Sequence, residues 1–272
     1  MRVFAEILRP ANCFMAIVGV LIGAAAAGVA FLPIPAPLAF ASIAVFLITG
    51  GGMVINDYYD YDIDLKSKPH RPLPSGRMER STAKKYALAL FGLGIIFSYL
   101  TNATYVFYLA VLNVMIAYVY ASHLKKTWAG NFVVSYLTAS TVIYGALLSG
   151  SLIFLAMIFF GLMFLASMGR ELSKSIEDYK VDKAMGAKTL AVTLGLDVAA
   201  WAVTAFTLIA LALSPLPHIY NLVSPLYLPV VAIADVIFIY GVWLIFKHPK
   251  RAQETFKAAM AAALAAFVAG LL

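Results

Sequence analysis

The chain has 272 residues, of which 63% are hydrophobic and only 12% are charged, and its mean hydropathy is +0.90. Soluble proteins carry about 25% charged residues, so this composition excludes an ordinary soluble domain and predicts an integral membrane protein. The net charge of +7 does not indicate a nucleic-acid-binding protein. Anionic lipid headgroups or an anionic substrate account for it better, because the basic residues gather in a few connections between apolar runs.

Apolar runs of about 20 residues are long enough to cross a membrane as helices. They lack the period-2 alternation of a membrane barrel, and a backbone in lipid must satisfy its own hydrogen bonds. The predicted fold is therefore an all-α integral membrane protein, with nine transmembrane helices in a single bundle around a central cavity. One domain is expected over residues 1–272. The predicted spans are 11–32, 38–57, 84–101, 104–122, 131–150, 152–170, 191–213, 226–246 and 255–272.

Arg2 and the small-residue tract Ala24–Ala27 are similar to parts of a secretory signal peptide, but Arg9 and Pro10 before a run of about 20 apolar residues favour a retained helix. All 20 lysines and arginines lie at the N-terminus or in the connections near 58–85, 123–130, 170–190 and 247–257. The alternate connections carry none, which predicts a cytoplasmic N-terminus by the positive-inside rule. The single cysteine, Cys13, excludes a disulfide within the chain.

The second span is followed by the acidic stretch NDYYDYDIDLKSKPHRPLPSG, residues 56–76. Asn56, Asp60 and Asp64 are spaced i, i+4, i+8 and are expected on one helix face, as several oxygen ligands of a hard cation such as Mg²⁺ would be. Asp57 and Asp62 fall off this face and are expected to be solvated or to pair with nearby lysines.

A second acidic stretch, RELSKSIEDYKVDKAMGAKTL, follows the sixth span at residues 170–190. Asp178 and Asp182 are again i, i+4, and Glu171 and Lys174 extend the same helical face. The two stretches lie four spans apart on the same predicted side of the membrane, which indicates an internal repeat whose halves form one divalent-metal site.

Basic residues lie close to both acidic stretches. A metal site alone would not require these basic residues. Carboxylates that hold Mg²⁺, surrounded by lysine and arginine, are suited to gripping a diphosphate. Beside an apolar bundle, this combination predicts a lipid diphosphate with its head at the acidic stretches and its tail among the helices. The basic residues concerned are Lys66, Lys68, Arg71, Arg77, Lys125, Lys126, Lys174, Lys180 and Lys188.

These motifs resemble those of the UbiA superfamily of intramembrane prenyltransferases. Asn56-Asp57-x-x-Asp60-x-x-x-Asp64 is similar to its first motif, Asp178-x-x-x-Asp182 to its second, and LRPANCFMA at 8–16 to its usual opening. Within the superfamily, the second stretch looks most like archaeal digeranylgeranylglyceryl phosphate synthases, although Ser175 stands where an aspartate is common and Val181 where a glycine is common. The resemblance implies Mg-dependent transfer of a geranylgeranyl group from a prenyl diphosphate to the hydroxyl of geranylgeranylglyceryl phosphate.

The resemblance also implies roles for particular residues. Asp60, Asp64, Asp178 and Asp182 are expected to be catalytic and, with Asn56, to bind Mg²⁺. The expected partners are a prenyl diphosphate donor, a lipid-like acceptor and membrane lipids, with no obligate protein partner. The active site is expected to open to the cytoplasmic side of the cell membrane. The residues expected to bind substrate are Asn12, Lys68, Arg71, Lys125 (or Lys126) and Lys174, with Arg9 and Lys188 as further candidates for the acceptor's phosphate.

Two alternatives stay open at this stage. An enzyme with the same chemistry could prenylate an aromatic or quinone precursor, or a chlorin-type acceptor. A protein of another class, an ion-coupled transporter, would suit Asp235, an isolated acid in the middle of the eighth span whose role is open. The acidic stretches oppose a transporter, because they lie at one membrane face rather than at its midplane.

Overall fold

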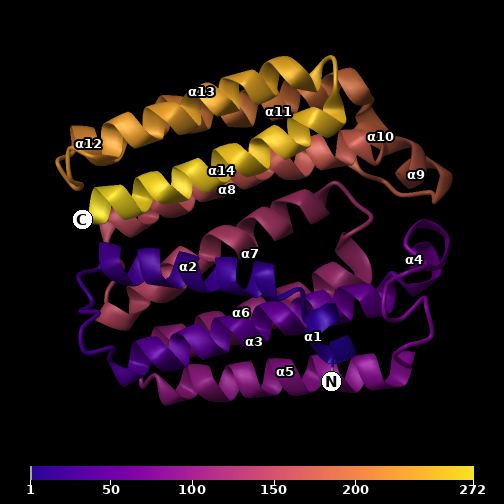
Figure 1. Cartoon of the computed structure of the whole chain (residues 1–272), viewed down its shortest axis with the longest axis horizontal. Coiled ribbons are helices and arrows are strands. Elements are labelled where there is room, and N and C mark those ends of the chain that lie inside the picture. Colours follow the sequence, from indigo (N-terminus) through magenta and orange to yellow (C-terminus); the bar gives the residue numbers. More distant parts are fainter. Residues whose placement is uncertain (1) are drawn as a thin grey trace. The chain divides into compact units, whose positions relative to one another are not determined.

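The computed structural model describes residues 2–272, and all regular elements in that range are helical (Figure 1). The only strand-like contact among these residues is a single bridge between Thr127 and Lys188. The all-α class predicted from the apolar runs is therefore confirmed.

The helices follow one another along the chain with short connections. They are α1 (Arg2–Leu8), α2 (Pro10–Ala26), α3 (Ala36–Tyr59), α4 (Tyr61–Ser67), α5 (Arg80–Leu100), α6 (Thr104–Val119), the π-helical turn η1 (Tyr120–Leu124), α7 (Ala129–Ala146), the 3₁₀ turn η2 (Leu147–Ser149), α8 (Phe154–Glu177), α9 (Tyr179–Ala184), α10 (Leu190–Leu194), α11 (Leu196–Leu213), α12 (Leu216–Ile219), α13 (Tyr227–Ile245) and α14 (Pro249–Leu271).

Eight of the described helices are long and apolar enough to cross a membrane, and the pair α1–α2, bent by 52°, brings the number to nine if it crosses as one span. The protein is thus a multi-pass membrane protein. The count of nine and the cytoplasmic N-terminus remain predictions. The bend lies at Arg9, whose backbone is left-handed (φ 52°, ψ 67°), and Pro10 opens α2 at a position where its missing N–H costs nothing.

Four ends of the predicted spans differ from the helix ends by five residues or more. The sixth span was predicted to end at residue 170, but α8 continues to Glu177. The first span was extended to residue 32, but α2 ends at Ala26. The seventh span was predicted to begin at residue 191. In the structure the long helix α11 begins at Leu196, and Gly195 (φ 94°, ψ 163°) separates it from the short α10. The last was begun at 255, whereas α14 starts at Pro249 and includes a polar first turn and a half.

The described chain divides into two compact units. Unit 1 comprises residues 2–123 and Thr141–Leu152, and unit 2 comprises Leu124–Ser140 and Ile153–Leu272, so that α7 contributes to both. The prediction of one domain over the whole chain stays a prediction.

Unit 1 is organised around α3, which packs along α5 and also contacts α1, α2 and α6 (Figure 1). Apolar helices gain nothing from leaving lipid for one another, so close van der Waals packing has to hold them together. Glycines provide it: a Cβ on Gly94 of α5 would lie 2.5 Å from Ile48, and one on Gly51 of α3 would lie 2.8 Å from Phe91. Val20, Leu38, Val106 and Tyr144 are buried in the core of this unit.

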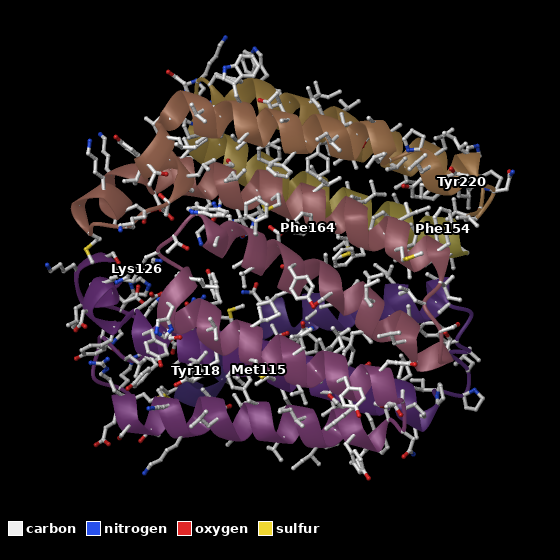
Figure 2. The ribbon with its side chains drawn as sticks, turned by 180° about the vertical axis from the view of Figure 1, so that it is seen from behind. Met115, Tyr118, Lys126, Phe154, Phe164 and Tyr220 are labelled. Atoms are coloured by element: carbon white, nitrogen blue, oxygen red, sulfur yellow. The ribbon has the colours of Figure 1, made fainter. Side chains whose placement is uncertain are left out.

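Unit 2 is organised around α8, which packs against α11 and α14, while α13 lies along α14 (Figure 1). Its core includes Met168, Leu172, Val203, Phe238 and Phe256. The unit has two distinct ends. Figure 2 shows Lys126 at one end and, at the other, Phe154 beside Tyr220, whose ring centroids are 5.5 Å apart.

Candidate active site

The first acidic motif lies where α3 gives way to α4 in unit 1. Asp60 joins the two helices, and its N–H donates to the Asn56 carbonyl at 3.0 Å while the Asp64 N–H donates to the Asp60 carbonyl at 2.8 Å. Because of these two i to i+4 hydrogen bonds, Asn56, Asp60 and Asp64 keep a helical spacing although they lie on both sides of the junction between α3 and α4. Asp60 is 7% and Asp64 only 2% exposed.

Two arginines pair with the buried carboxylates of this motif. Arg71 Nη1 lies 2.6 Å from Asp64 Oδ2 and 3.2 Å from Asp57 Oδ1, and Arg9 Nη2 also donates to Asp57 Oδ1. The expectation that Asp57 is solvated or pairs with lysines was therefore wrong: Asp57 is 4% exposed and is held by two arginines. A charge this deeply buried requires such partners, because burial without them is costly.

The remaining predicted substrate contacts of unit 1 are exposed. Lys68 follows α4, and its N–H donates to the Asp64 carbonyl at 2.8 Å, while its side chain is open to the surroundings. Asn12 lies in the first turn and a half of α2, and its Nδ2 is 3.8 Å from Met53 Sδ. Both residues are thus tied to the elements that carry the first motif.

The second acidic motif repeats this arrangement in unit 2. Helix α8 continues to Glu177, Asp178 joins it to α9, and the Asp182 N–H donates to the Asp178 carbonyl at 2.9 Å. The two joining aspartates have the same backbone conformation: φ −83°, ψ 0° at Asp60 and φ −81°, ψ 0° at Asp178. The internal repeat inferred from the sequence therefore extends to the local backbone.

Glu171, placed by the sequence on the same face as Asp178, is engaged elsewhere. It is 9% exposed, and Arg170 Nη1 lies 2.6 Å from its Oε1. Its charge is balanced within α8, so it differs from the two half-buried aspartates that follow.

The electrostatic surroundings of Asp182 bring together the predicted residues of unit 2. Burial and the negative charge of Asp178 raise the pKa of the Asp182 carboxyl above its ordinary value. The nearby Thr189 and the positive charges of Lys174 and Lys125 act on this pKa in the opposite direction. Two carboxylates that repel each other beside lysines are suited to a cation together with an anion.

The connection that carries Lys125 is fastened to the loop after the second motif. The Lys188 N–H donates to the Lys126 carbonyl at 2.6 Å, and Thr127 and Lys188 form the isolated bridge. The backbone thus holds Lys126 and Lys188, which lie 62 positions apart by their numbers, next to each other within unit 2.

The donor set fits Mg²⁺ bound with a diphosphate. Within residues 2–272 no three histidine, cysteine, aspartate or glutamate side chains lie close enough to hold an ion by themselves. Mg²⁺ is commonly bound through one or two carboxylates plus phosphate oxygens and water, and it prefers hard oxygen ligands. Asp60 with Asp64, and Asp178 with Asp182, offer such pairs.

Asp235 has a partner that the sequence did not reveal. Ser214 donates to Asp235 Oδ2 at 2.7 Å, and the hydroxyl of the buried Tyr227 donates to the Ser214 carbonyl at 2.7 Å. The acid therefore takes part in a hydrogen-bonded contact between α13 and the end of α11, which weakens the one feature that suited a transporter.

Comparison with known proteins identifies the family. The model of the UbiA prenyltransferase family matches residues 16–269. Proteins named digeranylgeranylglyceryl phosphate synthase are similar over their whole length. The one from Methanococcoides burtonii is 38% identical, covering 99% of this chain and 100% of its own, and the one from Thermococcus kodakarensis is 38% identical, covering 98% and 97%.

Solved structures show the same fold. A structure concerned with digeranylgeranylglyceryl phosphate synthase has a TM-score of 0.82 at 33% identity, covering 99% of this chain and 98% of its own. A UbiA homologue from Archaeoglobus fulgidus, bound to GPP and Mg²⁺, has a TM-score of 0.72 at 16% identity, with 99% of both chains covered. The resemblance inferred from the two acidic motifs is thus confirmed, and the chain belongs to the UbiA prenyltransferase family.

Proposed function

We propose that this protein transfers a geranylgeranyl group from geranylgeranyl diphosphate to the hydroxyl of geranylgeranylglyceryl phosphate, in Mg-dependent synthesis of archaeal ether lipids. The observation that carries the reaction class is the repeated motif, in which a membrane helix ends at an aspartate and a second aspartate follows one turn later beside basic residues. The full-length similarity to named digeranylgeranylglyceryl phosphate synthases supports this choice of donor and acceptor.

The proposed reaction breaks the bond between the allylic carbon and the diphosphate oxygen and forms an ether bond from the acceptor's hydroxyl oxygen to that carbon. Bound Mg²⁺ would neutralise charge on the leaving diphosphate. Asn56, Asp60, Asp64, Asp178 and Asp182 are proposed to hold the metal.

Basic side chains are proposed to complete the binding of both substrates. Arg71, Lys68 and Lys125 would contact the donor's diphosphate, which stabilises the charge that develops as the allylic bond breaks. Lys174 is proposed to contact the acceptor's phosphate, and Asn12 the donor. The hydroxyl proton is lost to solvent or to the released diphosphate.

The membrane arrangement is also part of the proposal. Basic connections alternate with connections that contain no lysine or arginine, which supports nine spans, a cytoplasmic N-terminus and an active site that opens to the cytoplasmic side. The chain is proposed to work as one domain with both motifs at this side. It needs the surrounding membrane lipids but no protein partner.

The experiment that tests the function is an acceptor screen with purified protein in detergent. Radiolabelled geranylgeranyl diphosphate and Mg²⁺ are supplied with geranylgeranylglyceryl phosphate, an aromatic acid or a chlorin-type acid. We expect diphosphate release and label transfer with the first acceptor only. Transfer only to another acceptor would contradict the acceptor, and absence of transfer to all three would contradict the proposed reaction.

A matched pair of variants links this activity to the motif. Asp64 is buried and Asp62, two positions earlier on the same short helix, is exposed. Asp64→Asn should abolish transfer, while Asp62→Asn should leave it within about twofold of the wild type, since an exposed charge contributes little. Equal losses in both variants would show that general acidity, rather than the motif, matters.

A further inference from the structure

Asp57 occupies a special position in the first motif. It precedes the end of α3 by two residues and lies off the face that carries Asn56, Asp60 and Asp64. Nevertheless it is as deeply buried as Asp60 and Asp64, and one of its oxygens, Oδ1, accepts from both Arg9 and Arg71. No metal-binding role accounts for a carboxylate oxygen that is already shared by two guanidinium groups.

The two arginines come from distant parts of unit 1. Arg9 lies at the bend between α1 and α2, and Arg71 lies in the turn after α4, so Asp57 joins the elements on both sides of the motif. The left-handed backbone of Arg9 is uncommon for a residue with a side chain, and such conformations persist where surrounding contacts hold them. The ion pair to Asp57 supplies one such contact.

The charges of this group are balanced without a ligand. Arg9 and Arg71 carry two positive charges, and Asp57 and Asp64 carry two negative ones. Arg71 is shared, with its Nη1 at 2.6 Å from Asp64 and 3.2 Å from Asp57. If a cation binds Asp64, Arg71 still has Asp57 as a carboxylate partner. The group of Arg9, Arg71 and Asp57 then has a net charge of one positive unit, which favours an anion.

We propose that Asp57 is a positioning residue that holds Arg9 and Arg71 together as a diphosphate-binding pair and retains Arg71 when Asp64 binds the cation. This inference rests on the proposed function. Asp57 touches neither donor nor metal in this role. Its effect passes through the arginines, whose planar, forked donors bind phosphate oxygens best when their orientation is fixed.

The direction in which Asp57→Asn changes the affinity for diphosphate distinguishes this role from simple electrostatics. Asp57→Asn removes a negative charge next to an anion site and nearly preserves the side-chain shape. By Coulomb's law alone, the variant would bind diphosphate more tightly. If Asp57 positions the arginines, the variant binds more weakly, because Arg71 is left with Asp64 as its carboxylate partner and Arg9 loses its own.

The test is calorimetric titration of purified protein with inorganic diphosphate in the presence of Mg²⁺. We expect Asp57→Asn to bind about tenfold more weakly than the wild type, the scale of one charge-assisted hydrogen bond. Asp57→Glu should recover part of the loss. Unchanged or tighter binding by Asp57→Asn would overturn the proposal, whereas failure of the wild type to bind would instead overturn the proposed function.

Two controls exclude a purely structural effect. Glu6 pairs with Arg77 in the same unit at 2.6 and 2.8 Å, but both side chains are more than 40% exposed, so Glu6→Gln removes the same charge without touching the motif. It should bind diphosphate like the wild type. In a background that carries both Arg9→Gln and Arg71→Ala, Asp57→Asn should cause a much smaller further loss, and an undiminished loss would show that Asp57 acts on the fold alone.

If Asp57→Asn does not fold, a substitution of its partner Arg9 tests the same ion pair. Arg9→Gln removes the charge of the partner on α2 and leaves Asp57 with Arg71. It should also weaken diphosphate binding by about tenfold. Wild-type binding by a folded Arg9→Gln protein would contradict the pairing of the two arginines.

Discussion

Substitution of Gly145 by alanine should destabilise the contact between α2 and α7 in unit 1. An added Cβ would lie 1.9 Å from the Val20 carbonyl oxygen, with further backbone atoms within 3 Å. The contact is reciprocal, since a Cβ on Gly23 of α2 would lie 1.9 Å from the Val142 carbonyl oxygen. The neighbours are backbone atoms, so no side chain can turn away to make room.

The expected size follows from this geometry. Ordinary contact begins near 3.4 Å, so the two helices would have to separate by about 1.5 Å, which forfeits much of their dispersion attraction. Overpacking of this kind costs roughly 1–3 kcal/mol or more. At about 2–4 °C per kcal/mol, Gly145→Ala should lower the melting temperature by roughly 2–12 °C.

The assay is thermal unfolding in detergent, followed by far-ultraviolet circular dichroism. The matched control is Gly92→Ala on α5, where nothing lies within 4 Å of the added carbon. This change should be neutral or slightly stabilising, because alanine favours helix over glycine. Diphosphate binding should also weaken in Gly145→Ala alone, since α2 carries Asn12 and follows Arg9. Melting temperatures within a degree of each other would refute this account of the contact.

Further measurements address the site and the topology. Asp60→Ala and Asp182→Ala should each abolish turnover in a folded protein, and near-normal release of diphosphate by either would show that its motif is dispensable. EDTA should stop the wild-type enzyme, with recovery when Mg²⁺ is restored; activity that persists would exclude a metal requirement. Arg71→Ala should lose about tenfold to a hundredfold in kcat/KM, since a hydrogen bond to a charged group contributes about 1.5–3 kcal/mol. Arg71→Lys should recover only part of that loss, because lysine lacks the planar fork; wild-type kinetics in the alanine variant would contradict the phosphate contact. Cysteines placed at Ser67 and Ser151 should react with a membrane-impermeant maleimide from opposite sides, and labelling from one side would contradict the orientation.

The sequence predicted most of the helices because a backbone in lipid has few alternatives to a helix about 20 residues long. The predicted helix ends were wrong where a helix continues into polar residues or where an apolar stretch is not helical. α14 begins at Pro249, a residue favoured in the first turn, but its polar start was excluded by a criterion based on apolarity alone. The left-handed backbone of Arg9 leaves no trace in a periodic pattern.

The site was predictable to the extent that it is local. Spacings of four residues brought Asp60 with Asp64, and Asp178 with Asp182, onto shared faces, and the structure keeps those spacings. The pairing of Asp57 was not predictable, because Arg9 is 48 residues away and Arg71 is 14 residues away. Periodicity reports which side chains share a face of one helix and says nothing about what another segment brings to it.

The burial of Cys13 gives this protein a chemical reporter of its own unfolding. The only thiol in the chain is fully buried at the start of α2, its Sγ is 3.3 Å from the Leu8 carbonyl oxygen, and Gly50 of α3 lies beside it. Buried thiols are unreactive, so a maleimide dye that fluoresces on coupling should stay dark until α1, α2 and α3 separate. The rate of labelling therefore measures the opening of the N-terminal bend without any added probe site, and ligands that hold Arg9 in place should slow it.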